Sequence, residues 1–283
     1  MGGGPLDAAD YSRGHSALRI ADSHRYEVDE SEAYWRKDVE AEILRHVADR
    51  HDAEVMYHAG DEGGWKELEY LKGLGFDMIR FTPGNHDKVD AEDAWGDGVV
   101  AEEFMEWPVV EGGRRYNVAM AHDPTDFRIG LETPASTDDA LKTEEGDFYD
   151  LIITGDSHFP RHHRINSRTV ADHAGALGRI YDADGEEVEH FFPDHRMLSE
   201  FPEKLRGEVP RPERSFSVVR FWNGITIYRY DAEELAEAYH YDHLEMGDIG
   251  PESVFYFEHR DTEVGGEENL KGIGTTGSRA MTD

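Results

Sequence analysis

Hydrophobic positions in the first third of the chain fall into short apolar runs separated by helical patterns. The runs over 17–21, 54–58 and 78–81 have the length and apolar character of buried strands. Between 31 and 50, and again over 65–74, apolar residues recur at the spacing of one helix face. Alternation of strand and helix predicts βαβ units, and therefore a mostly parallel sheet covered by helices.

The second half predicts antiparallel pairing instead. Apolar runs over 107–110 and 116–121 flank a Gly-Gly pair and predict a hairpin. A buried strand is expected over 150–154. The runs over 215–222 and 225–230 are separated by Asn-Gly, which favours a type I′ hairpin turn.

These patterns define one main domain, predicted over 16–231. Residues 1–15 are Gly-rich and polar and are expected to form a flexible arm. The acidic segment 181–214 contains four prolines and is interpreted as an insertion. Residues 232–283 form an acidic C-terminal extension, which begins with a short predicted helix and is expected to be flexible from about residue 265.

The net charge is extreme, and it indicates a solvent of high salt concentration more than it indicates a binding partner. Among 283 residues, 62 Asp and Glu stand against 29 Lys and Arg, for a net charge of −33. Aromatic residues make up 11% of the chain, so a buried core is still expected. Acid spread along a folded chain is typical of halophilic proteins, because concentrated salt screens the self-repulsion. The charge disfavours a protein that grips long stretches of nucleic acid.

Other composition features exclude several classes. The chain has no Cys, so a disulfide scaffold, a thiolate metal site and a Cys nucleophile are excluded. No apolar run approaches the length of a membrane span, and the first residues lack a secretory signal pattern. We therefore expect a cytoplasmic protein with no membrane partner.

Polar residues gather where the predicted strands end. They are Asp22-Ser23-His24, Gly60-Asp61, Gly84-Asn85-His86-Asp87, His122 and Asp156-Ser157-His158. The carboxyl ends of strands in an α/β sheet are where ligands bind, so these side chains are expected to converge. Oxygen and nitrogen ligands without sulfur suit Mn²⁺, Fe or Zn²⁺. A glycine directly before a ligand lets the backbone approach a bound ion closely.

The order of these motifs, D-x-H, G-D, G-N-H-D, H and G-x-x-H, resembles the calcineurin-like metallophosphoesterases. It is most similar to their small prokaryotic phosphodiesterase branch, from about Leu18 to Tyr230. The resemblance implies an α/β sandwich of two central β-sheets flanked by helices. It also implies metal-dependent hydrolysis of a small phosphoester, a diester rather than a monoester.

The same resemblance implies a dinuclear metal site. It assigns Asp22, His24 and His158 to the first metal, Asn85 and His122 to the second, and Asp61 to both. A metal-bridging hydroxide would attack the phosphorus, and His86 would act as the general acid for the leaving group. Asp87 would orient the His86 imidazole, while Asn85 and His86 would contact the substrate.

One position departs from the family pattern. The family's last motif is usually G-H-x-H, with its first His on the second metal, whereas this chain has Asp156 there. Asp156 could ligate the metal, giving an oxygen-rich site that prefers Mn²⁺ or Mg²⁺ over Zn²⁺, or it could be a turn residue. Mn²⁺ is the expected ion, with Mg²⁺, Ni²⁺, Fe²⁺ and Zn²⁺ as alternatives. Asp123 also stands where the family commonly has Gly.

Three alternatives remain open on the sequence. Asp156 allows a non-catalytic scaffold that keeps the fold, as in one retromer subunit that resembles these enzymes. A nuclease of the same fold is possible, with nucleic acid only as a substrate, although no basic patch supports it. Residues His162, His163 and Arg164 could contact substrate or lie in a solvated loop.

Overall fold

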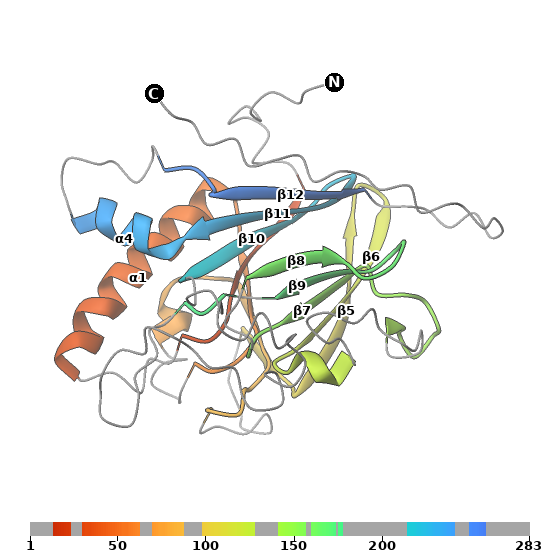
Figure 1. Cartoon of the computed structure of the whole chain (residues 1–283), viewed down its shortest axis with the longest axis horizontal. Helices are drawn as coiled ribbons and strands as arrows, with labels where there is room; N and C mark the ends of the chain where they lie inside the picture. Colours follow the sequence, from red (N-terminus) through yellow and green to blue (C-terminus); the bar gives the residue numbers. More distant parts are fainter. Residues whose placement is uncertain are drawn as a thin grey trace, which may run out of the picture.

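The protein folds as two β-sheets packed face to face, with helices on the outer face of the larger sheet (Figure 1). A computed structural model describes residues 14–23, 30–62, 70–87, 98–127, 141–156, 160–173, 175–177, 214–240 and 249–258. This architecture confirms the predicted α/β sandwich.

The larger sheet has seven strands in the described residues. Their order is β12 (Ser253–Glu258), β11 (Gly224–Asp231), β10 (Ser215–Phe221), β1 (His15–Ile20), β2 (Val55–His58), β3 (Met78–Phe81) and β4 (Val99–Ala101). Strands β1 to β3 are parallel, as the βαβ pattern predicted, and the β10–β11 hairpin is confirmed. Strand β4, which was not predicted, runs parallel to β3. The carboxyl ends of β1, β2 and β3 therefore lie at one edge of the sheet.

The smaller sheet has five strands in the part of the chain that the structure describes. Their order is β5 (Phe104–Glu111), β6 (Arg114–Ala121), β7 (Leu151–Thr154), β9 (Val170–His173) and β8 (Arg161–Arg164). The predicted β5–β6 hairpin is confirmed, and β7 runs parallel to β6. The solvated-loop interpretation of 162–164 is wrong, because these residues belong to β8, where His162 bonds to the buried Asp172 of β9.

In the described residues, the larger sheet is covered by α1 (Glu30–Arg50) and α4 (Ala232–His240), both of which were predicted. Their apolar faces pack against strand residues such as Leu18, Met56 and Tyr228. Of the helix predicted over 65–74, residues 70–73 are helical and 65–69 lie outside the described residues. A short 3-10 helix, η3 (Pro124–Phe127), follows β6.

A second apolar core fills the space between the sheets, and the ion pair of Arg19 and Asp172 crosses it. Arg19 of β1 alternates with Leu18 and Ile20, so its side chain faces the smaller sheet, where Arg19 Nε lies 3.2 Å from Asp172 Oδ2. The Arg19 guanidinium also donates to the carbonyls of Thr154 (2.9 Å) and Asp172 (3.0 Å). Arg19 and Asp172 are buried, at 1% and 0% exposure. Arg19 thereby ties β1 to β7 and β9.

Strand β12 was not predicted. Its alternating half-buried and exposed residues pair with β11, and the partly buried Phe255 and Phe257 pack against the core between the sheets. This segment lies within the predicted C-terminal extension, 232–283. Of the predicted arm 1–15, only residues 14 and 15 are described, and β1 begins at His15. Nearly all of the predicted insertion and the region from 265 onward lie outside the described residues.

None of the described helices is long and apolar enough to span a membrane.

We expect His51, which follows the end of α1, to make the stability of the fold sensitive to acid. Its ring is fully buried against Tyr228 and Tyr230, and a 2.7 Å hydrogen bond joins its Nε2 to the Tyr230 hydroxyl. Burial, with smaller effects of Arg50 and Arg220, lowers the pKa of His51 to about 3. The unfolded chain therefore takes up a proton near pH 6.5 that the folded chain does not.

Because the unfolded state binds this extra proton, stability falls as pH drops from about 6.5 toward 3. We expect the free energy of unfolding to lose about 2 kcal/mol between pH 7 and 5 through this residue. His51→Gln should show that much less acid sensitivity in urea titrations at the two pH values. Above pH 7.5 the difference between variant and wild type should be constant. Equal pH dependence of the two proteins would contradict the assignment.

Candidate metal centre

Three buried side chains converge at the carboxyl ends of β1, β2 and β6. Asp22, Asp61 and His122 each offer one ligand atom, and these atoms all lie within 4.8 Å of one another. His122 Nε2 lies 3.4 Å from Asp61 Oδ2. Asp22 and Asp61 follow strands of the larger sheet, whereas His122 follows β6 of the smaller sheet. The cluster therefore joins the two sheets.

Two further predicted residues reach this cluster. Asn85 Oδ1 lies 3.2 Å from His122 Nε2, and Asp156 Oδ1 lies 3.7 Å from the same nitrogen. The backbone N–H of Asp156 donates to Asp22 Oδ1 at 3.1 Å, so the loops after β7 and β1 are joined directly. Asp156 is thus at the cluster, with its carboxylate on the side of His122.

The residues of G-N-H-D tie the loop after β3 to Asp61. The backbone N–H of His86 donates to Asp61 Oδ1 at 2.9 Å. Asp87 Oδ2 accepts from the backbone N–H groups of Asp61 (2.9 Å) and Gly84 (2.7 Å). His86 is exposed at the rim of the cluster. Asp87 therefore holds two loops together, a role that the sequence did not predict, and its orientation of the His86 imidazole stays a prediction.

Two of the predicted ligands, His24 and His158, lie outside the described residues. Seven of the nine predicted site residues are described, and all seven lie at this one edge of the sandwich. They are Asp22, Asp61, Asn85, His86, Asp87, His122 and Asp156.

The backbone at the three aspartates is unusual. Asp22, Asp61 and Asp156 have φ angles of 50°, 56° and 59°, in the left-handed region that L-residues rarely adopt. Each stands just beyond the end of a parallel strand. Aspartate tolerates this conformation better than most residues, and such strain gathers at functional sites. All three aspartates at the cluster therefore share this backbone conformation.

The electrostatics of the cluster favour a cation. Burial, together with the carboxylates of Asp61 and Asp156, raises the pKa of Asp22 well above its ordinary value. Burial lowers the pKa of His122, but its hydrogen bond to Asp61 and the charges of Asp22, Asp61 and Asp156 outweigh this and raise it to about 10. Buried acids that stabilise an added positive charge so strongly would equally stabilise a metal ion, which would displace that proton.

The donor set also fits a metal in its geometry. His122 Nδ1 lies 2.6 Å from the Ala59 carbonyl oxygen, and because that oxygen can only accept, Nδ1 carries the hydrogen. In the neutral ring Nε2, the atom that faces the acids, is then left with its lone pair. Carboxylate, amide and imidazole ligands suit Mn²⁺, Mg²⁺, Fe²⁺ or Zn²⁺.

Close approach of neighbouring protein atoms requires the glycines before the ligands. A Cβ at Gly60 would lie 2.4 Å from His122 Nδ1, and one at Gly155 would lie 2.4 Å from the Ala59 carbonyl oxygen. At Gly84 a Cβ would lie 2.1 Å from Asp61 Oδ1 and 2.7 Å from the Asp61 nitrogen.

Gly84→Ala should therefore displace the Asp61 carboxylate. We expect its affinity for Mn²⁺, measured by calorimetry on chelator-stripped protein, to fall at least about tenfold. Gly73→Ala is the matched control, because nothing lies within 4 Å of a Cβ at that helical position. Wild-type affinity in Gly84→Ala would show that the Asp61 carboxylate is not placed for a metal.

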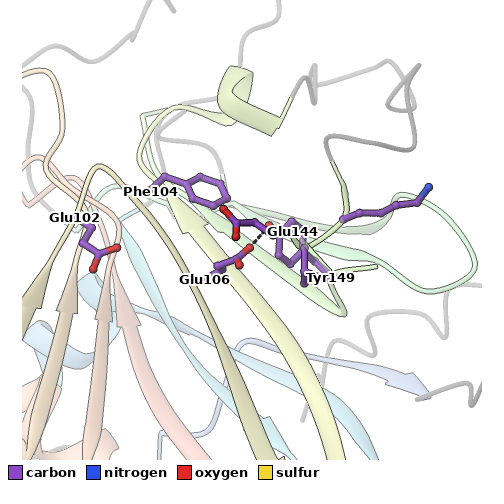
Figure 2. A pocket seen from close by; sticks show the side chains of 7 residues that line it. Glu102, Phe104, Glu106, Glu144 and Tyr149 are labelled. Carbon is purple, nitrogen blue, oxygen red and sulfur yellow. Dashed lines mark hydrogen bonds between the residues drawn. The ribbon is translucent and has the colours of Figure 1, made fainter. Parts of the chain in front are cut away.

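A separate pocket of about 500 Å³ lies on the outer face of the smaller sheet (Figure 2). It is lined by Glu102, Phe104, Glu106, Lys142, Thr143, Glu144 and Tyr149. Figure 2 shows the Glu106 carboxylate directed at Tyr149, whose hydroxyl donates to it at 2.5 Å. Three carboxylates against one ammonium disfavour a phosphate-bearing ligand here. The pocket is thus distinct from the metal cluster in chemistry.

Comparisons with known proteins agree with the fold. The sequence profile of the calcineurin-like phosphoesterase superfamily domain matches residues 17–188. No curated protein matches the chain. Among solved structures, Vacuolar Protein Sorting 29 from Cryptosporidium parvum is similar, with a TM-score of 0.51 and 16% identity over 78% of this chain and 92% of that one.

Two other solved structures have lower TM-scores. Yfce, a phosphoesterase from E. coli, has a TM-score of 0.40 and 11% identity over 78% of this chain and 94% of its own. A novel archaeal phosphodiesterase has a TM-score of 0.38 and 14% identity over 61% of this chain and 97% of its own. The profile match covers most of the chain, including all the strands that carry the cluster. The chain therefore belongs to the calcineurin-like phosphoesterase superfamily.

Proposed function

We propose that this protein is a metal-dependent phosphodiesterase. The observation that carries the proposal is the buried cluster of Asp22, Asp61 and His122, whose ligand atoms lie within 4.8 Å of one another at the edge shared by both sheets. The preference for a diester over a monoester rests on the resemblance of the motif set to the small prokaryotic phosphodiesterase branch. The expected substrate is a small phosphoester.

The proposed metal ligands are those of the family's motif order. Asp22, His24 and His158 would hold one divalent cation, Asn85, His122 and Asp156 the other, and Asp61 both. Two such cations, when bound, supply a hydroxide at neutral pH and offset the charge that develops on the phosphoryl oxygens. The position of the Asp156 carboxylate, 3.7 Å from His122 Nε2, supports its assignment as a ligand. A carboxylate in place of a second imidazole makes Mn²⁺ the proposed ion.

His86 is the proposed general acid. Its backbone N–H donates a hydrogen bond to Asp61 Oδ1, which positions the backbone of His86 beside the metal ligands. Its exposed position at the rim supports a role in giving a proton to the leaving oxygen, which departs on the side open to solvent. Asn85 and His86 are the proposed substrate contacts.

The non-catalytic scaffold is a weaker candidate. A scaffold needs the fold but not a buried set of carboxylates whose charges raise the pKa of His122 to about 10. Keeping such acids together costs stability in a protein that binds no cation, so their presence supports metal binding.

The test is hydrolysis of bis-p-nitrophenyl phosphate and of p-nitrophenyl phosphate by chelator-stripped protein titrated with Mn²⁺, Mg²⁺, Ni²⁺ and Zn²⁺. The assay uses molar KCl, because a net charge of −33 leads us to propose that the protein works in concentrated salt. We expect metal-dependent turnover, faster for the diester, which His86→Ala lowers by about a hundredfold.

The matched control is His15→Ala, which removes a histidine at the opposite end of β1 and should leave turnover within about twofold of wild type. Metal binding without turnover of either substrate would overturn the proposed function and favour the scaffold.

A further inference from the structure

Three polar side chains are buried directly beside the ligand loops and have no assigned role. Ser23 follows Asp22, Glu62 follows Asp61, and His58 ends β2; each is 0% exposed. His58 packs edge-on against Phe81, with ring centroids 5.1 Å apart, on the side of the sheet that the helices cover. Burying a carboxylate costs free energy unless hydrogen bonds compensate it, so the contacts of Glu62 are informative.

The hydrogen bonds fix one arrangement of these groups. The backbone N–H of Gly60 donates to His58 Nδ1 at 3.2 Å, so Nδ1 is an acceptor. His58 Nε2 lies 2.8 Å from Glu62 Oε2 and therefore donates to it. The Ser23 hydroxyl donates to the same carboxylate oxygen. His58 and Ser23 therefore both donate a hydrogen bond to the same carboxylate oxygen, Glu62 Oε2.

This arrangement connects the two aspartate loops through residues next to Asp22 and Asp61. The bond from His58 to Glu62 spans Gly60 and Asp61, which are the residues of the left-handed turn. The carbonyl of Gly60 accepts the backbone N–H of Asp22 at 2.9 Å. Ser23 brings the next residue of the Asp22 loop onto Glu62. The Glu62 carboxylate, one residue beyond Asp61, is thus in contact with both aspartate loops.

The order of contacts also excludes a nucleophilic role for Ser23. In a Ser-His-acid triad the hydroxyl donates to the imidazole, whereas Ser23 donates to Glu62. The complete burial of Ser23 keeps it from a substrate as well.

We infer that Glu62 is a positioning residue for the metal centre, which acts by holding the Asp22 and Asp61 loops at the spacing that a cation needs. Ser23 and His58 are its two partners. This inference rests on the proposed function, because the centre that it serves is the proposed metal site.

The test compares Glu62→Leu with Glu62→Gln in Mn²⁺ calorimetry on the chelator-stripped full chain. Leucine removes the acceptor of both bonds, and we expect the affinity for Mn²⁺ to fall about 10- to 100-fold. Glutamine keeps an amide oxygen that can occupy the place of Oε2 and accept both bonds, so its affinity should stay within about threefold. Ser23→Ala removes one bond and should weaken Mn²⁺ binding about fivefold, which keeps the inference testable if Glu62→Leu fails to fold.

The matched control is Glu40→Leu. Glu40 of α1 is equally buried, at 1% exposure, but its carboxylate pairs with Arg214 (3.6 Å) and not with a residue of a ligand loop. It should lose stability without losing affinity for Mn²⁺. In hydrolysis assays Glu62→Leu should need about 10- to 100-fold more Mn²⁺ for half-activation, while kcat at saturating Mn²⁺ stays within about threefold. A merely structural role would not separate these two quantities.

The outcomes are distinct. Wild-type Mn²⁺ affinity in both Glu62→Leu and Ser23→Ala overturns the inference, as does an equal loss in Glu40→Leu. A wild-type protein that binds Mn²⁺ but hydrolyses no phosphodiester overturns the proposed function, while the comparison of affinities still decides the role of Glu62. A wild-type protein that binds no Mn²⁺ overturns both.

Discussion

Asp61→Asn is expected to lower metal-dependent phosphodiester hydrolysis by about a thousandfold, equivalent to about 4 kcal/mol of transition-state stabilisation. Asparagine preserves the shape of the side chain and can still accept the 2.9 Å bond from the His86 backbone N–H. It removes the negative charge from the one ligand proposed to hold both cations, and it turns an amide toward them. Mn²⁺ binding, measured by calorimetry, should weaken together with the rate.

Stability separates this effect from unfolding. Without metal, the melting temperature of Asp61→Asn should lie within about 3 °C of wild type, equivalent to about 1 kcal/mol, because the substitution also removes a charge that repels Asp22. Asp150→Asn is the matched control: Asp150 is 9% exposed and accepts from the Asn117 backbone N–H at 2.8 Å, at the far end of β7. Its activity should stay within about twofold of wild type. Full activity in Asp61→Asn would remove Asp61 from the metal site.

Arg19→Met is expected to destabilise the protein by about 3–5 kcal/mol. The methionine fills much of the same space but leaves the Asp172 carboxylate, 0% exposed, beside His162 without the guanidinium. Burial raises the pKa of Asp172, but Arg19 and then His162 outweigh it and hold the pKa below its ordinary value. Without Arg19 the buried charge loses its largest compensation. Urea titrations near pH 7 measure the change.

Two comparisons test the cause. Arg115→Met breaks an exposed pair, 3.8 Å from Glu145, and should cost no more than about 0.5 kcal/mol. The double variant Arg19→Met/Asp172→Leu should recover at least half of the lost stability, because an apolar pair of similar volume needs no compensation. A loss in Arg19→Met as small as that in Arg115→Met would show that the crossing ion pair contributes nothing specific.

The order of elements and most of the candidate site could be predicted because the informative residues are local. Each short apolar run ending in Gly-Asp or Gly-Asn showed both a strand and the residue at its end, and the parallel pairing of β1, β2 and β3 follows from that pattern. The predicted ligands come together because parallel strands deliver their ends to one edge.

What the sequence could not provide is pairing between distant segments. Strands β8 and β9 are four residues each, and β8 carries His162 and Arg164, so its polar pattern resembled a loop. Asp172, which satisfies both Arg19 and His162, gave no signal without its partners. Glu62 and His58 were missed for the same reason, although the i, i+4 spacing of a carboxylate and an imidazole around Gly-Asp was visible.

The division of the ligands between the two sheets has a mechanical consequence. Asp22 and Asp61 belong to one sheet and His122 to the other, so a cation held among them would act as a cross-link between the halves of the sandwich. An ion that binds the native state alone adds about 2.7 kcal/mol of stability at a hundred times its Kd. Metal supply would then set how long each molecule survives heat or proteolysis, and resistance to unfolding would report the fraction of molecules loaded with metal.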